Sequence, residues 1–97
     1  MYRIYCENIY QEMVRSALNS RVDGYTLYEA QGCYKGCTEN SLVIELFGVT
    51  HEKAIEVARA IGEVTFQKEV YIIECPYILT AVQIPAYDVT NLLTVGA

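Results

Sequence analysis

Two short groups of side chains carry the binding chemistry that this sequence offers. Tyr34, Lys35 and Gly36 combine an aromatic face, an ammonium group and flexible glycine backbone in consecutive positions. Gln67 and Lys68 add an amide and a second ammonium group. Aromatic rings stack on nucleobases, while ammonium and backbone N–H groups bind phosphate. The sequence therefore predicts a site for an anionic, nucleotide-like small molecule.

The same side chains also have structural interpretations. A lysine in a turn is often simply solvated, and the nine tyrosines of the chain also suit half-buried packing and subunit interfaces. Gln67 and Lys68 gain a binding role only if they face the hairpin of an adjacent subunit. The choice between these interpretations depends on how the elements are placed.

Cys33 and Cys37 are the residues with the spacing closest to a metal motif. They could form half of a zinc site, but the sequence has no matching second pair, and His51 is its only histidine. In the structural interpretation they end strands, and Cys6 and Cys75 act as small buried apolar residues. We predict no metal site and reduced thiols.

Signals for catalysis are weak throughout the chain. No Ser-His-Asp order, glycine-rich nucleotide loop or pair of catalytic acids can be identified. We therefore expect no enzyme activity, no catalytic residues and no cofactor.

Composition limits the class of protein. The 97 residues suffice for one domain, residues 1–97, and the 53% of apolar residues suggests that part of the surface is covered by another subunit. A net charge of −5 argues against a nucleic-acid polymer as partner. No apolar run reaches the roughly 18 residues of a membrane span. The first residues are charged and alternating, unlike a secretory signal, so we expect a cytoplasmic protein.

A hairpin formed by residues 24–47 is the centre of the predicted fold. Its two strands, 25–31 and 41–47, are joined by a polar connection that contains Gly32 and Gly36. Alternation turns Leu42, Ile44 and Leu46 towards the helices. It turns Val43 and Phe47 to the other side, where their apolar character suggests cover by a second subunit.

Other elements follow from periodicity and capping signals. We expect a strand at 2–7, a strand within 64–74 whose strongest part is 70–73, and a further strand at 77–84. One helix should follow Asn8, which forms a capping box with Gln11. The other should start after Thr50 and stop at Gly62.

This order predicts an α+β, ferredoxin-like βαββαβ fold: an antiparallel sheet with two helices on one face and an extra C-terminal strand. The expected sheet order, fourth-first-third-second, leaves two edges open. It also puts Cys6 and Cys75 at opposite ends, on the order of 20 Å apart, too far for a disulfide.

Segments 27–32, 35–36 and 39–46, together with 68–74, resemble the second to fourth strands of CutA and related PII-like proteins. The resemblance implies a homotrimer with ligand sites between subunits. The sequence departs from the family at 65–68, where Thr-Phe-Gln-Lys replaces the His-Pro-Tyr-Glu stretch of CutA, and it has no long basic regulatory loop.

We accordingly expect a non-enzymatic small-molecule-binding protein, acting as a sensor that then meets a protein partner or as a sponge that sequesters its ligand. Tyr34, Lys35 and Gly36 of one subunit would form the site, closed by Gln67 and Lys68 of the next. The alternative is a structural or protein-interaction oligomer without a small ligand.

Overall fold

A computed structural model describes residues 1–76, 80 and 82. These residues form an α+β structure with a four-stranded antiparallel sheet and two helices. In chain order the elements are β1 (Tyr2–Glu7), α1 (Gln11–Asn19), β2 (Thr26–Tyr34), β3 (Cys37–Leu46), α2 (His51–Thr65) and β4 (Tyr71–Glu74). The predicted fifth strand, 77–84, lies outside the described residues apart from 80 and 82.

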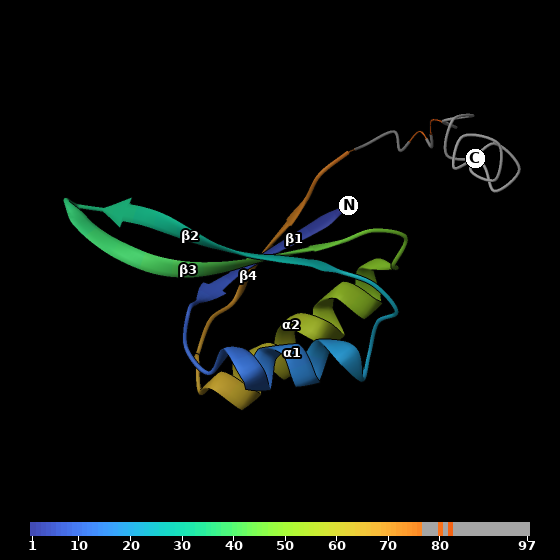
Figure 1. The fold of residues 1–97 in the computed structure, drawn as a ribbon, viewed down its shortest axis with the longest axis horizontal. Helices are drawn as coiled ribbons and strands as arrows, with labels where there is room; N and C mark the ends of the chain where they lie inside the picture. Colours follow the sequence, from blue (N-terminus) through green and yellow to red (C-terminus); the bar gives the residue numbers. More distant parts are fainter. Residues whose placement is uncertain (77–79, 81, 83–97) are drawn as a thin grey trace, which may run out of the picture.

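The strands lie in the order β2-β3-β1-β4, and both helices cover the same face of the sheet (Figure 1). This is the expected sheet order, and the arrangement is compatible with a ferredoxin-like fold. β1 lies inside the sheet, because it pairs with β3 on one side and with β4 on the other.

The core lies between the sheet and the helices. The predicted inward residues of β3, Leu42, Ile44 and Leu46, are all fully buried. Ile4 of β1 pairs with Ile44, so the two strands present one continuous apolar surface. Burying a side chain of this size contributes about 1.5–3 kcal/mol. The helices cover that surface with Val14, Leu18, Val57 and Ile61.

The register of the sheet keeps Cys6 and Cys75 at opposite ends, as expected. Cys6 is paired with Leu42 near the end of β1. The backbone N–H of Cys75 donates to the carbonyl oxygen of Met1, 2.7 Å away, at the other end of the same strand.

α1 does not begin as the sequence suggested. Asn8 was predicted as its N-cap, but the helix starts at Gln11, after Tyr10 in a left-handed conformation (φ 51°) with no side-chain cap. The backbone N–H of Asn8 donates instead to Asn40 and prolongs the pairing of β1 with β3. Because the backbone of Asn8 pairs with β3, the helix starts later in the chain.

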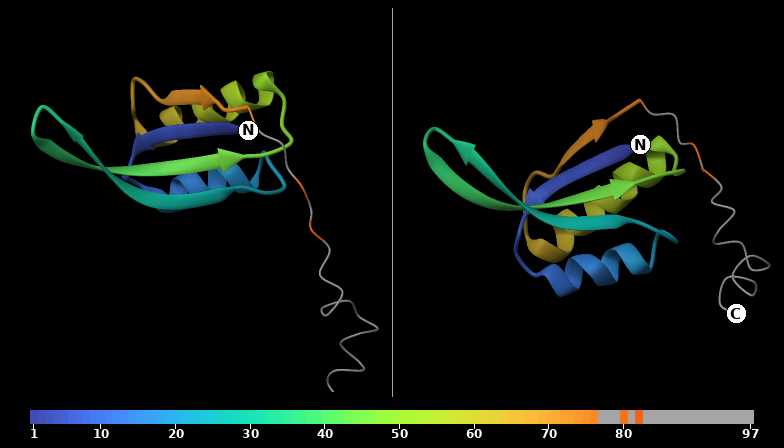
Figure 2. Two further views of the ribbon diagram at one scale, coloured as in Figure 1. Left: turned by 90° about the horizontal axis from the view of Figure 1, so that it is seen from above. Right: turned by 45° about the horizontal axis from the view of Figure 1, so that its top comes forward.

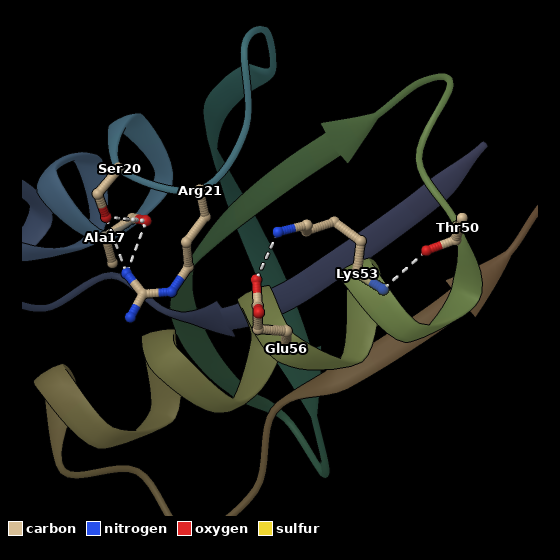
Figure 3. A network of polar contacts seen from close by, with 6 residues as sticks. All are labelled: Ala17, Ser20, Arg21, Thr50, Lys53 and Glu56. Carbon is tan, nitrogen blue, oxygen red and sulfur yellow. Dashed lines mark hydrogen bonds and ion pairs between the residues drawn. The ribbon is translucent and has the colours of Figure 1, made fainter.

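α2 begins as predicted and ends later than predicted. The Thr50 hydroxyl accepts the Lys53 N–H at 3.1 Å, while Lys53 also pairs with Glu56 (Figure 3). Gly62 does not end the helix. The helix continues to Thr65, and Phe66 in a left-handed conformation follows it.

Gly62 serves close packing rather than termination. A Cβ atom at this position would lie 3.3 Å from the carbonyl oxygen of Gln67 and 3.5 Å from a methyl group of Val70. The absence of a side chain at residue 62 therefore lets the segment after α2 return closely against the helix.

The central hairpin is longer than predicted. The polar stretch expected as a connection continues the ladder, which closes on the two-residue turn of Lys35 and Gly36, both with positive φ. Polar residues suffice there because neither side is buried. We call residues 31–40 the arm: all are exposed, and they extend past the ends of β1 and β4 (Figure 2).

We predict that Gly62→Leu destabilises the fold by about 1–3 kcal/mol, because the new side chain collides with backbone that cannot move independently. Urea unfolding measures the change. Glu63→Leu adds the same side chain at an exposed neighbouring position of α2 and should leave the free energy of unfolding within about 0.5 kcal/mol of the parent. Equal effects of the two variants would contradict the packing role of Gly62.

Candidate functional site

The tip of the arm presents an aromatic ring and an ammonium group together. Tyr34 is 66% exposed. The ammonium nitrogen of Lys35 lies 5.4 Å from the centre of the Tyr34 ring, within the range of a cation–π contact. Lys35 and Gly36 adopt positive φ, which turns the chain within two residues. The tip is thus a compact, cationic and aromatic projection.

A second feature lies where β1 ends. β3 continues past Glu7 towards the arm, while β4 begins beside Tyr5, so a space remains between β3 and the segment before β4. This space is a hollow of about 400 Å³, and we call it the β1-end hollow. Residues that line it include Tyr5, Glu7, Glu39, Lys68, Glu69 and Tyr71.

Gln67 closes one side of the β1-end hollow. Its amide oxygen accepts the backbone N–H of Glu7 at 2.9 Å, and its amide nitrogen donates to the Thr65 hydroxyl at 2.7 Å. The Thr65 hydroxyl donates in turn to the carbonyl oxygen of Ile61. Gln67 therefore ties the end of β1 to the end of α2, and within one chain both ends of its amide already have partners.

The structure brings together only some of the predicted site residues. Gln67 and Lys68 line the β1-end hollow, at the end of the sheet from which the arm extends. Tyr34, Lys35 and Gly36 lie farther out at the tip and do not line it. The assignment of the two groups to adjacent subunits stays a prediction.

Acidic side chains that the sequence analysis did not single out dominate the β1-end hollow. Glu7, Glu39 and Glu69 face one ammonium group, that of Lys68. Glu69 accepts the Tyr71 hydroxyl at 2.7 Å, and this bond, followed by the carboxylate charge, raises the pKa of Tyr71. The only signal in the sequence is the alternation that places Glu39 on one face of its strand.

The outer face of the sheet, opposite the helices, holds a partly buried ion pair. Nε and Nη2 of Arg3 donate to Glu45 at 3.0 and 2.9 Å, and these bonds raise the already high pKa of Arg3. The Tyr28 hydroxyl reaches the same carboxylate at 3.4 Å. Burial, followed by the charge of Glu45, raises the pKa of Tyr28.

Val43 differs from its expected role as an exposed residue of that face. Only 2% of it is exposed in a single chain, so its own subunit already covers it. The large apolar side chains that remain exposed on the outer face are Tyr28, Tyr71 and Ile73.

The two cysteines of the arm do not form half of a metal site. Cys33 pairs with Thr38, and Cys37 pairs with Tyr34, so the two thiols lie on opposite faces of the ribbon. Within the described part of the chain, no group of three or more metal-binding side chains is arranged to hold an ion.

A comparison with models of known protein families finds no match, and a comparison with curated proteins finds no similar sequence either. None of the helices in the described residues is long and apolar enough to span a membrane.

We predict that Cys6 resists alkylation, whereas Cys33 and Cys37 react readily. Cys6 is buried, and burial, assisted by the charge of Glu7, raises the pKa of its thiol to about 11. At pH 8 only roughly one thiol in a thousand would then be ionised. Iodoacetamide labelling followed by peptide mass spectrometry should find the arm cysteines modified first. In urea this difference should vanish; an equally fast reaction of Cys6 in the folded protein would refute the prediction.

Proposed function

We propose that this chain is a PII-like subunit of a homo-oligomer, a trimer as in the family that it resembles. In this proposal the protein binds a small anionic, nucleotide-like molecule between subunits and catalyses no reaction. It then acts as a sensor that meets a protein partner, or as a sponge that lowers the concentration of free ligand. The fifth strand at 77–84 belongs to the same proposal.

The observation that carries the proposal is the position of the tip. The tip of the β2–β3 hairpin, which carries Tyr34 and Lys35, projects beyond the sheet of its own subunit and away from the other described elements (Figure 2). Gln67 and Lys68 lie on the body of the molecule at the same end. A site that uses both groups is incomplete in one chain and requires a second copy.

The chemistry of these residues suits the two ends of a nucleotide. Lys35 and Lys68 supply ammonium groups for phosphate, and the exposed Tyr34 ring supplies a stacking surface. The carboxylate of Glu39, which only accepts hydrogen bonds, suits the N–H groups of a base rather than the phosphate. Phosphate should therefore contact the lysine ammonium groups, and the N–H groups of the base should contact Glu39.

The outer face of the sheet supports the alternative, a structural or protein-interaction oligomer without a small ligand. Tyr28 exposes apolar surface at one edge of the sheet, on β2, and Tyr71 and Ile73 expose more at the other edge, on β4. The Arg3–Glu45 pair already satisfies the charges in its middle. Such a face can assemble subunits whether or not a ligand binds.

Thermal-shift measurements with nucleotides and cyclic nucleotides separate the two functions. A true ligand at ten times its dissociation constant stabilises the protein by about 1.4 kcal/mol, a rise in melting temperature of roughly 6–11 °C. Tyr34→Ala and Lys35→Ala should each reduce this rise, while Lys53→Ala, on α2 away from the tip, should not. If both tip variants bind like the parent, the site lies elsewhere. If no compound shifts the melting temperature, the alternative is favoured.

Light scattering tests the assembly itself. We predict an oligomer at micromolar concentration, weakened by Ile73→Lys because the ammonium group would be buried beside Arg3. Met13→Lys makes the same change at an exposed apolar residue of α1 and should leave the mass unchanged. A parent protein with the mass of one subunit would rule out the proposed assembly.

A further inference from the structure

Among the described residues of its own subunit, little supports the arm. Beyond Asn40, which accepts the backbone N–H of Asn8, its two strands pair only with each other among the described residues, and all residues of the arm are exposed. A two-stranded ribbon without a covered face is marginally stable in water. A well-formed ribbon of this length therefore calls for a surface that receives it.

The charge of the tip has no counterpart among the described residues of its own chain. Lys35 is the only cationic residue of the arm. The ion pairs among the described residues are Arg3–Glu45 and Lys53–Glu56, so Lys35 contacts the Tyr34 ring but no carboxylate there. An unpaired cation at the end of a projecting ribbon is suited to contact an acidic surface.

The β1-end hollow is such a surface. Its three carboxylates outnumber its one ammonium group, and Glu7 and Glu39 take part in no ion pair among the described residues. The edge of β3 next to the hollow also offers backbone for pairing. Asn40 accepts from Asn8 on the β1 side of β3, so alternation turns the N–H and C=O of Thr38 to that same side, beyond the end of β1.

We propose that the tip of one copy docks into the β1-end hollow of a second copy, with the Lys35 ammonium among the carboxylates of Glu7, Glu39 and Glu69. The inference rests on the proposed homo-oligomer and specifies the contact that completes its site. The three carboxylates and the Lys68 ammonium group give the hollow a formal charge of −2, and the docked Lys35 changes it to −1. It also places Tyr34 beside Gln67 and Lys68 of the second copy.

Two other occupants fit the hollow less well. The tip of the same chain lies outside the hollow, on a ribbon that leads away from it. Residues 77–97 contain no lysine or arginine and one aspartate, so they do not complement an acidic wall. The tip of a second copy carries the required charge.

Carbodiimide coupling tests this contact, because the reagent joins an ammonium group to a carboxylate that touches it. Unlabelled and ¹⁵N-labelled chains are unfolded together, refolded and coupled, and crosslinked peptides are identified by mass spectrometry. Coupling of Lys35 to Glu7, Glu39 or Glu69 should join a light to a heavy chain in roughly half of the pairs, as random association of copies requires. Lys35→Gln should abolish the light–heavy pairs with these glutamates, and Lys53→Gln should preserve them.

Each outcome decides the proposal. Light scattering could find an oligomer in which Lys35 forms no light–heavy crosslinks, or forms crosslinks only to acidic residues outside the hollow. The docking would then be wrong, and the proposed assembly would stand. If the protein has the mass of one subunit, docking and assembly fail together. Light–heavy coupling at Lys35 without any thermal shift by nucleotides would support the docking and refute the proposed ligand.

Discussion

The pairing of β1 with both β3 and β4 is the constraint on which the rest of the structure depends. Ile4 illustrates it: this residue pairs with Ile44 on one side and Ile72 on the other, and it is fully buried beneath the helices. A shift of one residue in either register would turn this apolar surface towards water. β1 is also shorter than β3, so β3 extends beyond the end of β1. Both the arm and the β1-end hollow result from that difference in length.

The elements that the sequence predicted best are those whose pattern is set by burial. Leu42, Ile44 and Leu46 alternate because one side of β3 is buried, and the Thr50 cap depends only on a side chain and a backbone group three residues away. The errors arose where a contact with a residue outside the helix overrode a local signal. Asn8 has a side chain suited to a helix cap, but its backbone pairs with the sheet. Gly62 is suited to a helix end, but it serves close packing instead.

The positions of the candidate site residues could be predicted from the sequence only in part. Topology alone places Gln67 and Lys68 at the end of the sheet from which the arm projects, so this part could be expected. The acidic wall could not, because Glu7, Glu39 and Glu69 come from three separate segments that only the fold brings together. The link from Gln67 to the backbone of Glu7 likewise depends on where β1 ends. Local patterns carry no information about either contact.

In the two-residue turn at the tip, the residue type that would best stabilise the backbone differs from the lysine that supplies the positive charge. Lys35 holds a left-handed conformation (φ 51°), which costs a residue with a Cβ atom about 1–2 kcal/mol. Asparagine followed by glycine is the usual solution for such a turn, since asparagine tolerates this conformation. An asparagine at position 35 would relax the backbone and remove the only cation of the arm. Selection for a stable fold alone would thus favour asparagine at position 35. The proposed binding role would instead favour the lysine.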